Sequence, residues 1–302
     1  MTTHIPVLLQ EVIENLNIDK GDAVLDCTVG GGGYFEKFCE LVGKKGIVIG
    51  TDQDEDGLKR ASKKLSENKK CLCQKFLIKN NFRNLDEVLK NLKIQKVNKI
   101  VFDLGLSSDQ FEQSGRGFSF QKNEPLLMTF NKDGENLNFT ARDIVNDWNE
   151  ENIADILFGY GEEKFSRRIA KKIIEERKKK EIETTFDLVE IIKEAVPVWY
   201  RTGRKIHPAT KTFQALRIAV NDEISSLEDG LLKGFENLEK SGRMAVVSFH
   251  SIEDRMVKNF MRDKKKTKEG ILITKKPIVS SREEIKKNPR ARSAKLRVIE
   301  KV

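Results

Sequence analysis

The sequence predicts an α/β protein in which a Rossmann-like parallel sheet is interrupted by an all-helical insertion. Short apolar strands alternate with amphipathic helices from the N-terminal region to Asp103. Between residues 113 and 204 the chain keeps helical patterns and shows no convincing strand. Strand patterns return at residues 244–249, which predicts that the chain comes back to complete the sheet.

The first part of the sheet is expected to consist of strands that end in acidic residues. Apolar strands are expected at residues 23–27, 46–50 and 99–103. The acids at their carboxyl ends are Asp26, Asp52 and Asp103. Amphipathic helices separate them, with Leu58 and Leu65 on one apolar face. This alternation implies parallel βαβ units with right-handed crossovers.

The second part of the chain is expected to be helical and then to rejoin the sheet. Helices are expected in the insertion at residues 141–148, 151–158, 163–180 and 185–196. One long helix should follow from Thr210 to about Leu238, and two tail segments, 271–274 and 296–300, should pair antiparallel. The predicted domains are therefore a sheet domain of residues 1–112 and 205–302 and a helical insertion domain of residues 113–204.

Composition favours a protein that meets an anionic partner. The 302 residues carry a formal net charge of +9, with 34% charged and 38% hydrophobic residues. None of the four cysteines forms a CxxC pair, and no histidine lies near Cys71 and Cys73, so we expect no metal. The N-terminus has no basic leader, and no apolar stretch approaches the ~20 residues that span a bilayer. We therefore expect a cytoplasmic protein without a membrane partner.

The glycine run after the first strand indicates a small-molecule site. Gly30, Gly32 and Gly33 follow Asp26, and Asp52 lies at the distance expected for a carboxylate on ribose hydroxyls. A dinucleotide pattern beginning at Gly30 would place Phe35 where its third glycine belongs. Asp26 would repel a pyrophosphate but can accept a hydrogen bond from an ammonium, which favours S-adenosylmethionine. The alternatives are a glycine turn without a ligand and a helix-capping role for Asp52.

Seven sequence blocks, taken in order, resemble one family over nearly the whole chain. The blocks are HIPVLL at 4–9, DLGLSS at 103–108, RGFSF at 116–120, YGEE at 160–163, HPATKTFQA at 207–215, SFHSIEDR at 248–255 and NPRARS at 288–293. The chain is similar in these blocks to the bacterial methyltransferases called RsmH or MraW. That resemblance implies a class I methyltransferase sheet and transfer of a methyl group from S-adenosylmethionine to N4 of a decoding-region cytosine in 16S ribosomal RNA.

The resemblance also implies a set of site residues. The cofactor site would comprise Gly32, Gly33, Tyr34, Asp52, Phe82, Asp103 and Gln110. Phe82 would be a wall against adenine, although its helical spacing also suits core packing. Asp103 would accept a hydrogen bond from the cytosine amine or contact the cofactor. The alternative is that Asp103 only caps the end of its strand. His250 is a weaker catalytic candidate, and His4 and His207 receive no role.

The chain departs from the family pattern at three places. Tyr34 stands where histidine is usual, and Asp109 stands where proline is usual. The segment from Leu126 to Phe130 lacks an acid and an arginine that the family carries there. These departures concern the substrate pocket and the rate. None of them removes a glycine of the run or Asp52.

The RNA partner would be held by basic and aromatic side chains around a base that has left its stack. Candidate RNA contacts in the tail are Arg290 and Arg292, with Lys286 and Lys287 beside them. Arg116 and Phe118, with Phe120, either contact a base or anchor their loop. The insertion helix adds Arg167, Arg168, Lys171, Lys172 and residues 177–180, for which a solvated charged face is the alternative.

Three other functions remain open at this point. One is methylation of an amine on another nucleic acid. A second is a catalytically weakened RNA-binding factor that assists assembly of the small ribosomal subunit. A nicotinamide-dependent oxidoreductase is disfavoured by the missing third glycine. The sequence leaves the oligomeric state open between a monomer and a homodimer.

Overall fold

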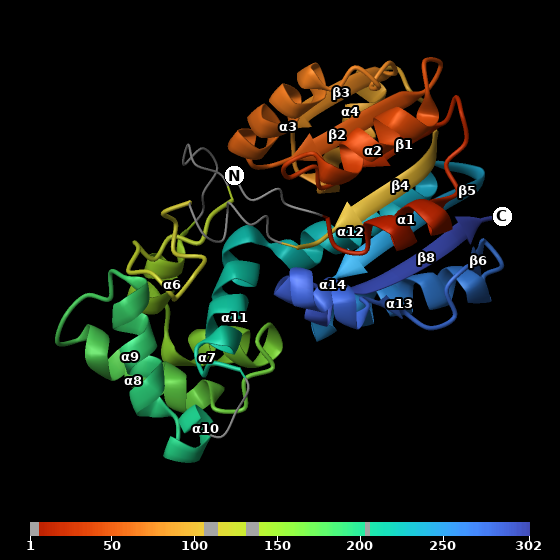
Figure 1. The fold of residues 1–302 in the computed structure, drawn as a ribbon. Coiled ribbons are helices and arrows are strands. Elements are labelled where there is room, and N and C mark those ends of the chain that lie inside the picture. The colour runs from red at the N-terminus through yellow and green to blue at the C-terminus, as the bar shows by residue number, and fades with distance from the viewer. Residues whose placement is uncertain (1–5, 106–113, 131–138, 203–205) are drawn as a thin grey trace. The chain divides into compact units, whose positions relative to one another are not determined.

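The computed structural model describes residues 6–105, 114–130, 139–202 and 206–302 (Figure 1). The chain forms two compact units. We call Met1–Gly105 with Ile224–Val302 the sheet unit, and Leu106–Glu223 the helical unit. The α/β class that the sequence predicts is confirmed, because one unit is built on a largely parallel sheet.

The sheet unit alternates strands and helices before and after the insertion. Before it lie α1 Leu9–Leu16, β1 Ala23–Asp26, α2 Gly33–Val42, β2 Ile47–Asp52, α3 Glu55–Glu67, β3 Gln74–Lys79, the 3₁₀ turn η1 Phe82–Asn84, α4 Leu85–Asn91 and β4 Val97–Asp103. After it lie α12 Glu223–Glu236, β5 Leu238–Ser248, α13 Ser251–Lys266, β6 Gly270–Leu272, β7 Ile278–Val279, α14 Arg282–Lys287, η2 Pro289–Ser293 and β8 Lys295–Lys301. The edge strand β3 was not expected from the sequence, because only three of its residues are half-buried and none is fully buried.

The strands follow the order β3-β2-β1-β4-β5-β8-β6, and β7 pairs with β8 at one side. The five strands from β3 to β5 run parallel, whereas β8 pairs antiparallel with both β5 and β6. The predicted antiparallel pairing of the two tail segments is thereby confirmed. The order reverses between β1 and β4, and ligands of such sheets bind beyond the carboxyl ends of the strands at this point.

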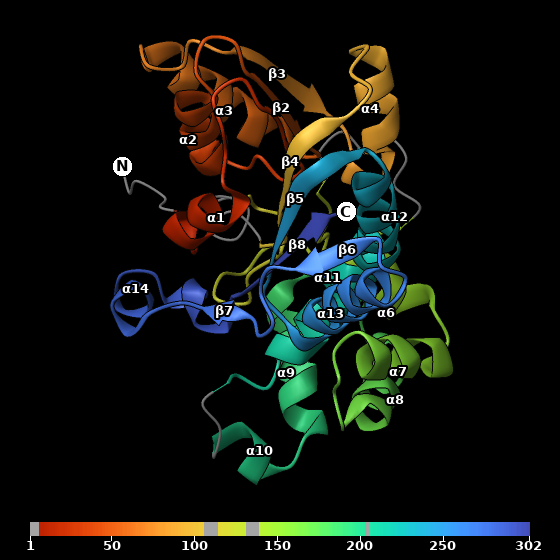
Figure 2. The same cartoon turned by 90° about the vertical axis from the view of Figure 1, so that its right-hand side faces the viewer.

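Alternate residues of the central strands enter two separate cores, so the sheet is covered on both faces (Figure 2). Val24 faces a core with the helices α1, α2 and α3, while Leu25 faces the other core with α4, α12 and α13. Val101 and Phe102 divide in the same way. The strand ends are therefore held rigidly from both sides.

The helical unit contains the four predicted helices, which are confirmed with small shifts at their ends. They are α6 Ala141–Asp147, α7 Glu150–Gly159, α8 Ser166–Arg177 and α9 Thr185–Ala195, and two more are α10 Val198–Thr202 and α11 Thr210–Asn221. Capping boxes begin α6 and α9. The side chains of Thr140 and Thr184 accept a hydrogen bond from the backbone N–H of the third residue of each helix. Among its described residues the unit has no strand, apart from an isolated bridge between Pro125 and Thr184.

Two expectations about the return of the chain were wrong. The expected long helix from Thr210 to Leu238 is two helices, because Asp222 takes a left-handed conformation (φ 46°) that ends α11. The expected domain boundary at residue 205 also differs from the structure, in which the sheet unit resumes at Ile224. The reason is that α11 buries Phe213 and Leu216 in the helical core. No helix in the described ranges is long and apolar enough to cross a bilayer.

Candidate functional site

Three aspartates lie side by side at the carboxyl edge of the sheet. Asp52 ends β2, Asp26 ends β1 and Asp103 ends β4, and these strands are neighbours in that order. Asp26 is fully buried between the other two acids. The structure thus brings together the three acids that the sequence analysis singled out, at the point where the strand order reverses.

Thr28 connects two of these acids and was not singled out from the sequence. Its backbone N–H donates to Oδ1 of Asp26 (3.1 Å), and its hydroxyl oxygen accepts from the backbone N–H of Asp103 (2.6 Å). A threonine two residues after a strand-end acid is a signal for such a turn, but its bond to β4 depends on tertiary structure.

The glycine run wraps over the end of β2. Gly30 and Gly32 have positive φ angles of 50° and 78°, which L-residues with a side chain rarely adopt. The N–H of Gly30 donates to Oδ2 of Asp52 (2.7 Å), and the N–H of Asp54 donates to the other oxygen (2.8 Å). A Cβ atom on Gly32 would lie 2.9 Å from that of Ala61, whereas one on Gly31 would meet nothing within 4 Å. The run therefore packs closely on α3 and leaves open space at Gly31.

Burial makes all three carboxyl groups weak acids. Burial raises the pKa of Asp26 to about 8, and the neighbouring charges of Asp103 and Asp52 add to this effect against a lowering bond from Thr28. Burial raises the pKa of Asp103 to about 7 despite a hydrogen bond from Gly105. Burial also raises the pKa of Asp52, to about 6, and hydrogen bonds from backbone donors offset part of this rise. Perturbed acids that cluster at one edge of a sheet are a common mark of a ligand site.

Two carboxylate oxygens in this cluster have no hydrogen-bond partner among the described residues. They are Oδ2 of Asp26 and Oδ1 of Asp103, both buried. An unsatisfied buried acceptor is costly, so each of these atoms calls for an explanation. The pair offers acceptors to a ligand that carries donors or positive charge, such as an ammonium, a hydroxyl or an amine.

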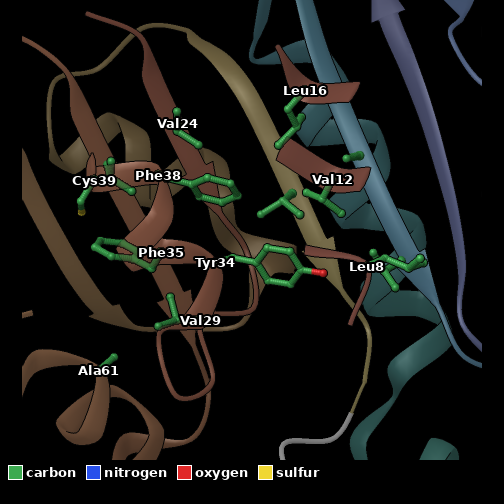
Figure 3. Packing of buried hydrophobic residues seen from close by; sticks show 14 of the residues in the cluster. Leu8, Val12, Leu16, Val24, Val29, Tyr34, Phe35, Phe38, Cys39 and Ala61 are labelled. Carbon is green, nitrogen blue, oxygen red and sulfur yellow. The ribbon is translucent and has the colours of Figure 1, made fainter. Parts of the chain in front are cut away.

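Tyr34, predicted at the cofactor, directs its side chain into the core instead. Its ring packs in the cluster of α1 and α2, and Figure 3 shows it reaching toward Leu8. Its hydroxyl donates to the backbone carbonyl of Val7. Burial, with the charge of Asp103, holds the pKa of the hydroxyl well above its usual range. Only the backbone of Tyr34, in the first turn of α2, remains available to a ligand on the glycine run.

Phe82 follows the carboxyl end of β3 and begins η1. Its half-buried ring meets Phe102 edge-on, with centroids 5.5 Å apart, and lies against Gly230 of α12. A Cβ on Gly230 would come within 2.8 Å of this ring. The core-packing alternative therefore accounts for part of the Phe82 surface, while the residue stays partly exposed.

His250 is the N-cap of α13 in the structure. Its Nδ1 accepts from the N–H of Glu253 (3.3 Å), while Oε2 of Glu253 accepts from the N–H groups of His250 (3.2 Å) and Phe249 (2.8 Å). This reciprocal arrangement is a capping box, with histidine in the place of serine or threonine. It gives His250 a structural function, whereas its catalytic role stays a prediction.

Glu253 is the second residue that the sequence analysis did not single out. It is 3% exposed, and its charge contributes to the raised pKa of Asp103. The loop that it holds also carries Phe249, whose ring packs on Gly105. A Cβ atom on Gly105 would lie only 2.8 Å from Cε2 of this ring. Glu253 therefore fixes the residues packed beside Asp103. The sequence signal for this role is an acid three residues after His250, in the first turn of an amphipathic helix.

Arg116 and Phe118, proposed as RNA contacts, are core residues of the helical unit. Only 6% and 5% of their surfaces are exposed. Nη1 of Arg116 donates to the carbonyls of Thr129 (3.0 Å) and Phe130 (2.7 Å), and the Phe118 ring stacks on that of Phe130. Burial on this scale corrects the RNA-contact prediction and supports the loop-anchoring alternative.

The remaining predicted residues divide between exposed and buried positions. Arg292 is exposed in η2 and Arg290 is half-buried there, with Lys286 and Lys287 exposed on α14. In the helical unit Phe120 stacks on His207, with ring centroids 4.7 Å apart. Gln110 and His4 lie outside the described residues, as does Asp109.

Comparison with known proteins places the chain among methylases. A family profile described as the MraW methylase family matches residues 1–302. A protein of Persephonella marina named ribosomal RNA small subunit methyltransferase H is 45% identical over 303 residues, which cover 100% of both chains. One of Brevibacillus brevis with the same name is 42% identical and covers 99% of this chain and 98% of its own. A crystal structure described as an rRNA methylase of Clostridium thermocellum shares the fold, with a TM-score of 0.51, 16% identity, and coverage of 99% and 100%.

Proposed function

Because this chain belongs to the MraW methylase family, we propose that it transfers a methyl group from S-adenosylmethionine to N4 of a decoding-region cytosine in 16S ribosomal RNA. The observation that carries the proposal is the row of three strand-end acids beside the glycine run. Two buried carboxylate oxygens of this row lack partners in the part of the chain that the structure describes. The full-length relatives named ribosomal RNA small subunit methyltransferase H support the choice of substrate.

The residues present fit S-adenosylmethionine better than a dinucleotide. The unpartnered Oδ2 of Asp26 suits the ammonium of its amino-acid part, and Asp52 suits the ribose hydroxyls through lone pairs that its two backbone donors do not use. Phe82, which is partly exposed, offers its ring to adenine. Gly31, with open space around it, and the backbone of Gly32 allow close approach. When bound, the cofactor supplies an electrophilic methyl group on a sulfonium.

Asp103 has the position and acidity to activate the amine. The lone pair of a cytosine amine is delocalised into the ring, so an acceptor for one of its hydrogens makes the nitrogen a better nucleophile. Oδ1 of Asp103 is such an acceptor, and its pKa of about 7 leaves a substantial ionised fraction at neutral pH. Rigid placement of this group from β4 contributes the orientation on which methyl transfer depends.

The Glu253 loop keeps the neighbourhood of Asp103 ordered. Glu253 holds the backbone of Phe249 and His250, and Phe249 packs on Gly105, whose N–H stabilises the Asp103 carboxylate. We assign Glu253 a positioning role through these contacts. In this scheme His250 supports the loop, and no proton transfer by its imidazole is needed, since the methylated amine loses its extra proton readily to water.

The test is methyl transfer from labelled cofactor to small ribosomal subunits isolated from a strain that lacks the enzyme. We expect one methyl group on the decoding-region cytosine, located by mass spectrometry of RNA fragments, and its loss with Asp103→Ala. An unlabelled cytosine together with labelling elsewhere would instead support the alternative of another amine substrate.

A second candidate function is a catalytically weakened RNA-binding assembly factor. The observation that keeps it is the segment from Leu126 to Phe130, which departs from the family pattern and buries Leu126 and Met128 in the helical core. Calorimetry separates the two candidates, because an enzyme must bind S-adenosylmethionine and a factor without activity need not. Tight binding together with turnover on small subunits would exclude the factor.

A further inference from the structure

An exposed tryptophan stands at one side of the helical unit on a rigid aromatic base. Trp199 of α10 is 56% exposed, whereas the next residue, Tyr200, is 2% exposed. The Tyr200 hydroxyl donates to Oε2 of the buried Glu163 (2.6 Å), which fixes α10 to the loop before α8. The Phe165 ring lies edge-on to Trp199 with centroids 5.9 Å apart. Such an arrangement holds the indole in place while its surface stays in contact with solvent.

Two cations lie beside these aromatic rings. Nζ of Lys164 lies 4.4 Å from the Trp199 ring centroid, and Cζ of Arg168 lies 5.7 Å from that of Phe165. Arg167 and Lys171 continue the same exposed stripe, at the three- and four-residue spacing that places side chains on one helix face. In the described part of the chain no carboxylate pairs with any of these four cations within 4.0 Å.

The other cations predicted on this helix are already engaged, except Lys178, which is exposed at the C-terminal end of α8. Lys172 pairs with Glu176 and Glu194, at 2.8 and 2.9 Å. Lys179 and Lys180 pair with Glu176 and Asp187, and Arg177 donates to the carbonyls of Val145 and Trp148. Apart from Lys178, the predicted cations of this region without a carboxylate partner in the described residues therefore lie in the N-terminal half of α8 and just before it, on the side that begins at Lys164 beside Trp199.

We infer that Lys164, Arg167, Arg168, Lys171 and Trp199, here called the basic-aromatic patch, form a docking surface for single-stranded RNA. An unpaired base stacks on the Trp199 indole, and the neighbouring phosphates meet the cations of α8. A regular RNA helix keeps its base faces covered, so the patch selects an unpaired segment. This inference rests on the proposed RNA substrate. It adds the place on the helical unit at which that RNA binds.

Fluorescence tests the stacking directly. The chain has two tryptophans, so Trp148→Phe leaves Trp199 as the sole indole, and Trp148 lies half-buried against Phe139. We expect a short oligoadenylate to quench the emission of Trp199 in a saturable way that weakens with salt, and a double-stranded RNA of the same length to quench it far less. Absence of quenching by the single strand would overturn the inference.

Variants then connect the patch with the natural substrate. Trp199→Ala should weaken binding of oligoadenylate and raise the KM for small subunits about tenfold, with Trp199→Phe close to the parent. The matched control is Phe186→Ala, since Phe186 is also exposed (45%) but lies among Glu181, Asp187 and Glu190. Equal affinities for Trp199→Ala and the parent would contradict the inference, as would quenching by ribosomal proteins alone.

The two proposals fail in different ways. One outcome is that the parent methylates the decoding-region cytosine, RNA does not quench Trp199 emission, and the Trp199 variants keep the parent's affinity and KM. The docking inference is then wrong and the proposed function stands. If Trp199 is quenched by single-stranded RNA but no small subunit is methylated, the patch stands and the proposed function fails.

Discussion

The backbone N–H of Gly30 donates a 2.7 Å hydrogen bond to Oδ2 of Asp52 and so ties the glycine run to the end of the second strand. The other oxygen of Asp52 accepts from the N–H of Asp54. Asp52 thereby shapes the run that surrounds the cofactor site, in addition to its proposed contact with ribose hydroxyls. The two functions depend on the same carboxylate.

Asp52→Asn should weaken S-adenosylmethionine binding at least tenfold. The amide keeps the size of the side chain but presents an NH₂ group to one of the two backbone donors, Gly30 or Asp54, so one bond is lost. A lost hydrogen bond to a charged group costs about 1.5–3 kcal/mol. Calorimetry measures the affinity, and Asp155→Asn, an exposed residue of α7, is the control. Unchanged affinity would show that Asp52 matters to neither the run nor the ribose.

Gly32→Ala should destabilise the protein, whereas Gly31→Ala should not. The Gly32 backbone is left-handed (φ 78°), and an added Cβ would meet that of Ala61 at 2.9 Å. Strain of this kind costs about 1–3 kcal/mol. A Cβ added to Gly31 would meet no described atom within 4 Å, and its φ is not positive, so Gly31 is a matched control one residue away. Thermal unfolding compares the two, and equal melting temperatures would mean that the run relaxes without cost.

The strand-end acids and the glycine run were predictable because each depends on a few consecutive residues. An apolar strand followed by an acid, or a cluster of glycines, is visible in the sequence itself. Thr28 was not predictable as a site residue, since its bond to Asp103 joins segments distant in the sequence. The bond of Glu253 to Phe249 is local, but the packing of Phe249 on Gly105 beside Asp103 is not visible in the sequence. Arg116 is of a residue type that often contacts RNA. Its burial and its hydrogen bonds to two backbone carbonyls, which only the structure shows, give it a structural role inside the helical unit.

Local capping signals made some helix boundaries predictable. Thr140 and Thr184 begin their helices with capping boxes, and the predicted starts of α6 and α9 agree with the structure. The break at Asp222 has no glycine or proline, so the apolar pattern runs through it. Tyr34 was assigned to the cofactor site by the resemblance alone, and its side chain points into the core.

The affinity for S-adenosylmethionine should rise with pH between about pH 6 and about pH 8. The pKa values of Asp52, Asp103 and Asp26, about 6, 7 and 8, mean that these acids ionise in this range, and the ionised forms accept from an ammonium and from hydroxyls. Below its pKa, each acid that must ionise lowers the affinity about tenfold per pH unit. Calorimetry in buffers of different ionisation enthalpy should show proton release on binding. Asp26→Asn should flatten the upper part of the profile, and a parent profile already flat there would contradict this prediction.

The same acids should make the cofactor-free protein less stable as the pH rises. Their folded-state pKa values exceed the ordinary value of 3.8, so the folded form holds protons that the unfolded chain releases. The stabilising contribution is fully present below pH 3.8 and is lost as the pH rises through about 8. Melting temperatures across this range should fall less in Asp26→Asn than in the parent. A parallel fall in both would assign the loss of stability to other groups.

His250→Asn should retain methyl transfer, and Glu253→Ala should lose most of it. Asparagine is a good N-cap and replaces the bond from His250 Nδ1 to the Glu253 N–H, whereas alanine at 253 removes the acceptor of two backbone donors beside Asp103. If the imidazole transferred a proton in the reaction, His250→Asn would lower kcat by the 10²–10⁴-fold typical of general acid–base catalysis while leaving the melting temperature unchanged. A positioning role predicts instead a small change in kcat for His250→Asn and a large one for Glu253→Ala, with recovery in Glu253→Gln because its amide oxygen still accepts. Single-turnover rates on small subunits, taken with melting temperatures, therefore decide between a catalytic histidine and one that builds the loop around Asp103.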